Sequence, residues 1–192
     1  MAVRSIRRVE GFHGTTVSNA EDILDGGFTL SRNDYDWLGK GVYFFEDAPR
    51  TAKSWAERQC EQSEGEPAVL HSVIDLTSCM NLLDTAWNDR LEAVYEQYAR
   101  LFEEDLPVND GGFRELDCDV IDYACYYHKE QYGRPIQSVR AVFHEVDDEE
   151  LFPGSHIQKR SHLQIAVRDP SVISETRLWE PEGDDPREWH LF

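Results

Sequence analysis

Basic residues, cysteines and long apolar stretches are all scarce in this chain, and each scarcity argues against certain classes of protein. The cysteines, Cys60, Cys79, Cys118 and Cys125, form neither close pairs nor a metal-ligand spacing. We therefore expect no metal site, and reduced thiols in a cytoplasmic protein rather than a disulfide framework. No apolar stretch approaches the length of a membrane span, so we expect no membrane partner. The basic start, residues 1–8, leads directly into charged sequence, and we expect no signal peptide.

Acidic residues outnumber basic residues by 38 to 19, which gives a formal net charge of −19. A phosphate-rich partner that is bound across a broad surface requires the opposite sign. The composition therefore disfavours a general nucleic-acid-binding protein, although one local basic patch is enough to hold a nucleic-acid substrate. The same acidity favours solubility and fits a basic partner.

Chain length and the periodicity of apolar residues indicate one domain, residues 1–192, that contains both strands and helices and no internal repeat. Strands are expected at 4–15, 41–45, 68–75, 136–146, 163–168 and 174–179. Helices are expected at 18–26, 47–61, 78–104 and 116–131. Ser18 and Glu21 form a capping box for the first helix, and Asp47 is the expected cap of the second. The aromatic and aliphatic stripe along 78–104 is typical of core packing.

Two glycine-flanked, strand-like segments each contain one polar ring. The first is Phe12-His13-Gly14-Thr15, and the second is Gly39-Lys40-Gly41-Val42-Tyr43-Phe44-Phe45. Glycine next to a buried histidine lets a ligand approach the backbone closely. Gly41, two positions before Tyr43, leaves one face of the tyrosine ring open for stacking. His13 and Tyr43 are therefore the leading candidates for ligand binding.

Together with the helix between them, these segments resemble the nicotinamide-binding core of the poly(ADP-ribose)-polymerase-like, or diphtheria-toxin-type, ADP-ribosyltransferases. The family pattern is aromatic-His-Gly-Ser/Thr, a helix with Asn, Ile-Leu and Gly-(Leu/Phe), then Gly-Lys-Gly-(Ile/Val)-Tyr-Phe. The matching residues are Phe12–Thr15, Asn19, Ile23-Leu24, Gly27-Phe28 and Gly39–Phe44. The resemblance implies an α+β fold, the ADP-ribosyltransferase fold, with two packed, mostly antiparallel sheets and surrounding helices. The helical stretch at about 80–133 does not match the family core and is expected to be an insertion.

The resemblance also implies a role for each matched residue, with NAD as the substrate. His13 would donate a hydrogen bond to a ribose hydroxyl, the Gly14 backbone would bind the nicotinamide carboxamide, and Tyr43 would stack on the nicotinamide ring. Two further candidates for contact with NAD are Thr15 and Arg32.

The helix after Tyr43 adds two candidates. Thr51, eight positions after Tyr43, matches a small hydroxyl residue that contacts the carboxamide in the family. The family often has a second stacking aromatic eleven positions after the tyrosine, but this position is Ser54 here, next to Trp55. Either Trp55 stacks on the nicotinamide or one wall of the site is open.

The third family position departs from the pattern. In the family a glutamate in Glu-Tyr-(Ile/Val)-Val-Tyr-Asp binds the ribose 2′-hydroxyl and stabilises the oxocarbenium-like transition state. In the matching stretch, residues 162–169, Gln164 takes the place of the glutamate. An amide oxygen accepts a hydrogen bond but has no charge. One charge at ~4 Å and an effective dielectric constant of about 20 contributes roughly 4 kcal/mol, or about three orders of magnitude in rate.

We therefore expect His13, Tyr43 and Gln164 to form the catalytic set of a slow enzyme, unless another acid supplies the missing charge. The candidates for that acid are Glu145 and the acidic residues 147–150. A solvated loop is the plain alternative for this acidic stretch. The loss of the glutamate favours transfer of a single ADP-ribose over chain elongation.

In the family, the loop before the last core strand contacts the acceptor. Here this loop, residues 153–161, and the residue that follows it hold the densest basic cluster of the chain: His156, Lys159, Arg160 and His162. Such a cluster fits an anionic acceptor, including a phosphodiester, or the pyrophosphate of NAD. A solvated loop is the third alternative, and the sequence leaves all three open.

The leading hypothesis is a mono-ADP-ribosyltransferase that transfers ADP-ribose from NAD to a macromolecular acceptor, either protein or RNA or DNA. The resemblance alone implies that such a domain is a toxin or phage-defence effector, paired with an antitoxin or another inhibitor protein. A catalytically inactive module that binds NAD or ADP-ribose and an NAD glycohydrolase are the alternatives. An RNA 2′-phosphotransferase shares the fold, but the chain lacks the set of basic residues expected for that reaction.

Overall fold

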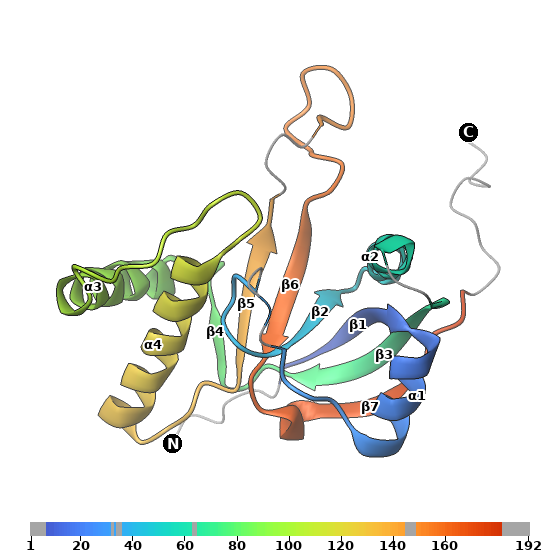
Figure 1. Cartoon of the computed structure of the whole chain (residues 1–192), viewed down its shortest axis with the longest axis horizontal. Helices are drawn as coiled ribbons and strands as arrows, with labels where there is room; N and C mark the ends of the chain where they lie inside the picture. The colour runs from blue at the N-terminus through green and yellow to red at the C-terminus, as the bar shows by residue number, and fades with distance from the viewer. Residues whose placement is uncertain (1–6, 32, 34–35, 63–64, 145–148, 182–192) are drawn as a thin grey trace.

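The fold is mixed α+β, with one seven-stranded sheet (Figure 1). The computed structural model describes residues 7–31, 33, 36–62, 65–144 and 149–181. The strands are β1 (Arg8–Thr16), β2 (Val42–Glu46), β3 (Pro67–Asp75), β4 (Cys79–Asn81), β5 (Ser138–Phe143), β6 (His162–Val167) and β7 (Ile173–Leu178). The α-helices are α1 (Val17–Gly26), α2 (Pro49–Gln62), α3 (Thr85–Leu101) and α4 (Glu115–Tyr132), and a short 3-10 helix spans Pro170–Val172.

The sheet consists of two parts that are joined by a short contact between β1 and β2. The strand order is β4-β5-β6-β2-β1-β3-β7, and only the β4–β5 pair is parallel among the described strands. β1 pairs with β3 from Arg8 to Thr16, but it pairs with β2 only through Gly11 and Phe12. Beyond Phe12 the two strands separate, and the gap between them is where the candidate site lies.

The structure does not show the two packed sheets that we expected. β2 pairs with β1 on one side and with β6 on the other, so hydrogen bonding is continuous through all seven strands. The alternation of apolar residues reports which face of a strand is buried, but it does not report which strand is its neighbour. The coarser prediction, an α+β fold, is confirmed.

Most expected elements are confirmed, with corrections at the helix starts. The cap of α1 is Thr16, whose hydroxyl accepts from the Asn19 backbone N–H at 3.2 Å, rather than Ser18. Asp47 does not cap α2: it lies in a turn with a φ of 51°, and its N–H donates to the Glu10 carbonyl. Periodicity places a helix start only to within a residue or two, so it does not indicate which residue forms the cap.

One strand, β4, was not expected, because residues 79–81 fall in a stretch with helical periodicity. These residues pair in parallel with Ser138–Arg140 of β5. The helix begins only at Thr85, where the Asp84 carboxylate accepts from the Ala86 N–H at 3.0 Å. A long-range partner strand therefore overrides the local preference at the start of this stretch.

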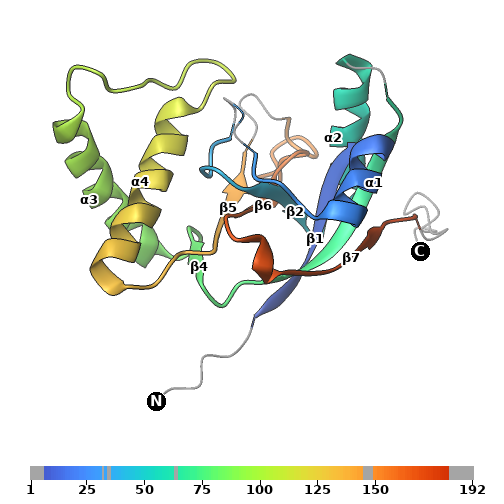
Figure 2. The same ribbon diagram turned by 60° about the horizontal axis from the view of Figure 1, so that its bottom comes forward.

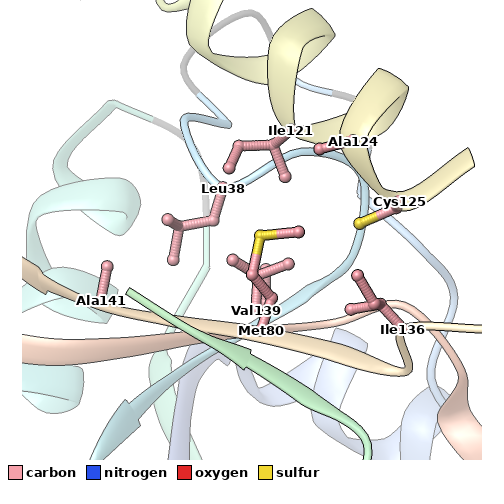
Figure 3. Packing of buried hydrophobic residues seen from close by; sticks show 9 residues of the cluster. Leu38, Met80, Ile121, Ala124, Cys125, Ile136, Val139 and Ala141 are labelled. Carbon is pink, nitrogen blue, oxygen red and sulfur yellow. The ribbon is translucent and has the colours of Figure 1, made fainter. Parts of the chain in front are cut away.

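The helical segment 80–133, which we expected to be an insertion and call the insertion below, is part of the core. In Figure 2, α3 and α4 lie beside β4 and β5, while α1 and α2 lie beside β1 and β3. Figure 3 shows the packing between α4 and the sheet, and the cluster consists of Leu38, Met80, Ile121, Ala124, Cys125, Ile136, Val139, Ala141 and Ala166. Trp87, Leu91 and Val94 of the α3 stripe pack against it, although Tyr95 and Leu101 are exposed. The stripe is therefore core packing over part of its length.

Leu38 links this core to the chain segment before β2. Its side chain is fully buried and points into the cluster beneath α4 (Figure 3). Full burial of a leucine contributes about 1.5–3 kcal/mol. The insertion therefore holds the segment that leads to Tyr43.

The cysteines are all free thiols in the structure. Burial is the largest cause that raises the pKa of Cys118 and of Cys125, each to about 11, so these two thiols stay protonated at neutral pH. No helix among the described ranges combines the length and the apolar character that a membrane crossing needs.

Candidate functional site

A cleft of about 1530 Å³ opens between β1 and β2, on the side where their pairing ends. The predicted site residues that line it are His13, Gly14, Thr15, Tyr43, Thr51, Trp55, Lys159, Arg160, His162 and Gln164. His156 is not part of the wall, and Arg32 lies outside the described residues. The structure therefore brings together residues from four separate stretches of sequence.

His13 connects the two diverging strands. Its Nδ1–H donates to the Tyr43 carbonyl oxygen at 2.8 Å, and because a carbonyl only accepts, Nδ1 carries the proton. Burial lowers the pKa of His13, an effect that the bond to Tyr43 partly opposes, so the ring is neutral at pH 7. In the neutral ring Nε2 is an acceptor. The expectation that His13 donates to a ribose hydroxyl therefore changes, because Nε2 would accept from that hydroxyl instead.

The Tyr43 hydroxyl is engaged in the loop before β2. It donates to the Gly39 carbonyl at 2.8 Å and accepts from the Leu38 N–H at 2.9 Å. Burial is the largest cause that raises the pKa of Tyr43, with a smaller contribution from the nearby Asp36 carboxylate. The phenol therefore stays neutral, and the part of Tyr43 that is open to a ligand is the ring rather than the hydroxyl.

Gly14 is a point of close contact between β1 and α2. A Cβ atom at this position would lie 2.2 Å from the Ala52 carbonyl oxygen, so any side chain would displace the helix. The same helix carries Thr51 and Trp55 into the cleft wall. The glycine thus sets the distance between the histidine strand and the opposite wall.

The backbone of Gly14 also faces the gap. The Glu10 carbonyl accepts from the Asp47 N–H at 3.0 Å, so the backbone groups of Glu10 point towards β2. Backbone groups of alternate residues in a strand point to the same side, which directs those of Phe12 and Gly14 towards β2 as well. Because the β1–β2 pairing ends at Phe12, the N–H and the carbonyl of Gly14 point into the cleft. This direction fits the predicted contact with a carboxamide.

Trp55 supplies the aromatic side chain of the α2 wall. Its ring lies near Phe45, with centroids 6.4 Å apart, and the Arg58 guanidinium lies 5.7 Å from the ring centre. Ser54 lines the cleft too but has no ring to stack. Trp55 therefore places an aromatic ring in this wall, and its stacking on nicotinamide stays a prediction.

Gln164 is held by hydrogen bonds at both ends of its amide. Its Oε1 accepts from the Trp37 indole N–H at 2.7 Å, and its Nε2–H donates to His162 Nε2 at 3.0 Å. His162 Nδ1–H in turn donates to the Arg160 carbonyl at 2.7 Å. Trp37 was not among the predicted residues, because an aromatic in a polar loop carries no signal for a partner 127 positions away.

The cleft wall is basic although the chain is acidic. Its charged residues are the basic Arg50, Arg58, Arg114, Lys159 and Arg160 and the acidic Asp22 and Asp36. The chain as a whole has a net charge of −19. This local reversal of sign favours an anionic ligand in the cleft. Sequence reasoning identified the bases in the loop before β6 but missed those on α2 and before α4.

The negative charge that Gln164 lacks is not supplied by Glu149 or Glu150, the two described residues of the acidic stretch proposed for this role. Glu149 pairs with Lys159 at 2.6 Å and Glu150 accepts from the Gly154 N–H at 2.8 Å, and neither lines the cleft. Glu145, Asp147 and Asp148 lie outside the described residues.

Asp36 is the buried acid of the wall, and sequence reasoning missed it. Its carboxylate accepts from the Asn33 N–H at 2.9 Å, and burial raises its pKa. Nothing in the polar segment around it distinguishes this aspartate from a solvated one.

The insertion supports the loop that precedes β2. The Asp122 carboxylate of α4 accepts from the Lys40 N–H at 3.1 Å and from the Arg168 guanidinium at 2.6 Å. Gly39 has a φ of 77°, and a Cβ atom there would lie 2.6 Å from Asp122 Oδ1. The glycine is therefore required for both the turn and the close approach of α4.

The part of the chain that the structure describes contains no cluster of three or more metal-ligating side chains. Comparison with protein-family models and with curated proteins finds no match to this chain. The functional assignment therefore depends on the motif residues and on their arrangement around the cleft.

Proposed function

We propose that the protein is an NAD-dependent mono-ADP-ribosyltransferase with an ADP-ribosyltransferase fold. The observation that carries the proposal is the convergence of the motif residues, from His13 to Gln164, on one cleft between two diverging strands. A cleft with a basic wall in an acidic chain suits a dinucleotide with two phosphates. The two halves of the sheet would then correspond to the two sheets of that fold, joined here by the short β1–β2 contact.

The reaction breaks the bond between ribose C1′ and the nicotinamide nitrogen. The bonding electron pair leaves with nicotinamide, positive charge develops on the ribose, and a nucleophilic atom of the acceptor adds to C1′ with loss of its proton. Nicotinamide would lie against the Tyr43 ring, with its carboxamide at the Gly14 backbone. His13 Nε2 would accept from a ribose hydroxyl, which fixes the sugar for attack.

Gln164 supplies polarity without charge at the developing cation. Its Oε1 has a second lone pair beyond the bond to Trp37, and this lone pair would accept from the ribose 2′-hydroxyl. The absence of a carboxylate predicts a rate about three orders of magnitude below that of a matched carboxylate enzyme. Transfer of one ADP-ribose to protein or nucleic acid fits such an enzyme better than chain elongation does.

A binding module is the second candidate, and the state of Gln164 is the observation that favours it. Both ends of the amide are already bonded within the protein, to Trp37 and to His162. A module of this kind would hold NAD or ADP-ribose without cleaving it. An effector role with an inhibitor protein remains a prediction from the resemblance alone.

The test is incubation of the purified chain with NAD that is labelled in the adenosine half, followed by assay of free nicotinamide. Cell extract is then added and separated into protein, RNA and DNA fractions. Nicotinamide release with label in a macromolecular fraction supports the transferase, and release with free ADP-ribose alone supports a glycohydrolase. Binding of NAD without release supports the module. Neither binding nor release would contradict all three.

A matched pair of variants shows whether nicotinamide release arises from the cleft or from a contaminating enzyme. Tyr43→Ala removes the stacking ring and should abolish release. Tyr126→Ala removes a tyrosine of α4 that is 61% exposed and does not line the cleft, and it should leave release unchanged.

A further inference from the structure

The amide of Gln164 is part of a closed circuit of side chains. Trp37 donates to its oxygen, and its nitrogen donates to His162. The His162 ring stacks on Phe143, with centroids 5.1 Å apart and an interplanar angle of 29°. The Phe143 and Trp37 rings form a T-shaped pair with centroids 5.7 Å apart, which closes the circuit.

The strands explain three of the four positions. His162 and Phe143 are directly paired between β6 and β5, so their side chains share one face of the sheet. Gln164, two residues after His162, lies on the same face. The fourth member, Trp37, comes from the loop before β2, next to the buried Leu38.

The hydrogen-bond donors and acceptors permit only one orientation of the Gln164 amide. An indole N–H can only donate, so the Gln164 oxygen must face Trp37. The Arg160 carbonyl can only accept, so His162 carries its proton on Nδ1 and presents an Nε2 lone pair to the Gln164 nitrogen. A flipped amide would place two donors against each other at Trp37 and two acceptors against each other at His162.

We propose that Trp37 and His162 are positioning residues that select an amide at position 164 and fix its direction in the cleft. This inference rests on the proposed function, since its purpose is to aim the second Oε1 lone pair at the ribose. A carboxylate at this position has no N–H for the lone pair of His162. The surroundings of Gln164 are therefore matched to glutamine rather than to glutamate.

A double-mutant cycle tests whether the two residues act through Gln164. Trp37→Phe removes one hydrogen bond, and His162→Phe removes two, those with Gln164 and with the Arg160 carbonyl, while each variant keeps a ring. Each should lower the rate of nicotinamide release about fivefold to tenfold with little change in KM for NAD. In a Gln164→Ala background the same changes should have no further effect. An equal loss in both backgrounds would show a general packing role and overturn the proposal.

Rescue provides a sharper check, and it covers a His162→Phe variant that fails to fold. His162→Gln restores an acceptor for the Gln164 nitrogen through its side-chain carbonyl, so it should recover most of the wild-type rate. A His162→Gln variant that folds, as judged by thermal unfolding, but is as slow as Gln164→Ala would contradict the role of His162 as an acceptor.

A second readout does not depend on turnover. The side-chain amide signals of Gln164, assigned by their loss in Gln164→Ala, should shift in NMR spectra of Trp37→Phe and of His162→Phe. They should not shift in Tyr126→Phe, which changes an exposed side chain outside the cleft. If the wild-type protein releases no nicotinamide, the proposed function fails, but these signals still decide the inference. Unshifted signals in both circuit variants would overturn it.

The circuit also changes the expected result of Gln164→Glu. The new carboxylate accepts from Trp37 and draws a second proton onto His162, whose positive charge then offsets the added negative charge. We expect a change in release of less than about tenfold, against the roughly thousandfold that an uncompensated charge would produce. Adding His162→Gln removes the cation, and the double variant should exceed Gln164→Glu alone. A thousandfold gain from Gln164→Glu alone would contradict the proposed match to an amide.

Discussion

The motif region, residues 8–62, and the insertion, residues 80–133, contribute to the cleft in different ways. The motif region provides the rings and backbone groups that face the cleft, chiefly His13, Gly14 and Tyr43. The insertion lines the cleft only through Arg114 and the glycines before it, yet it holds the loop before β2 by packing and by hydrogen bonds. Residues that would contact a ligand are therefore recognisable in short stretches, whereas their supports come from distant ones.

The largest expected effect lies in the motif region. His13→Ala removes the Nε2 acceptor and the bond to the Tyr43 carbonyl, and should lower nicotinamide release about a hundredfold to a thousandfold. Steady-state kinetics measure the loss, and circular dichroism checks that the fold is retained. His128→Ala changes a histidine of α4 outside the cleft and serves as the control. Unchanged turnover in His13→Ala would rule out the proposed site.

The next effect tests whether the insertion supports the loop through packing. Leu38→Ala leaves a cavity beneath α4 and should lower the free energy of unfolding by about 2–5 kcal/mol. Urea unfolding measures the change. Leu101→Ala, at an exposed position of α3, should stay within about 0.5 kcal/mol of wild type. Similar losses in both variants would mean that Leu38 is not a specific anchor.

A smaller effect tests the hydrogen bonds of the insertion. Asp122→Asn keeps the size of the side chain but weakens its bonds to the Lys40 N–H and to Arg168. We expect a loss of about 1–2 kcal/mol in stability and a severalfold fall in nicotinamide release, because the loop that carries Tyr43 loosens. Asp89→Asn on the exposed side of α3 is the control. Full activity in Asp122→Asn would show that these hydrogen bonds of the insertion do not support the site.

The smallest effect is the pH dependence that His13 contributes. Burial lowers the pKa of His13 below its ordinary value of 6.5, so the unfolded chain takes up a proton more readily than the folded one. The stabilisation is complete above pH 6.5 and is lost as the pH falls through the folded-state pKa. His13→Gln lacks this titration, and its stability should fall less between pH 7 and pH 5 than that of wild type. Parallel curves would contradict the assignment of a partly buried, neutral histidine.

The local pattern of apolar residues predicted much of the fold, because strands and amphipathic helices repeat their buried positions every two to four residues. The β4 strand escaped prediction, since it depends on a partner strand beyond α4. The continuous sheet escaped it for the same reason, because the β1–β2 and β2–β6 pairings join distant segments.

The candidate site shows the same limit. His13, Tyr43 and Gln164 were predicted because each lies in a motif with fixed spacing. Trp37, Arg58 and Arg114 were not, because they become part of the cleft only through long-range packing. The direction of the His13 hydrogen bond also depended on the Tyr43 carbonyl, a backbone atom whose position the sequence alone does not reveal.

The most direct test follows nicotinamide release and NAD binding in a single sample of the full chain. We predict that NAD binds and is slowly cleaved, that NAD shifts the backbone amide signal of Gly14 in NMR spectra, and that Tyr43→Ala abolishes both effects. A wild-type chain that neither releases nicotinamide nor shows any change at Gly14 on addition of NAD would contradict this prediction.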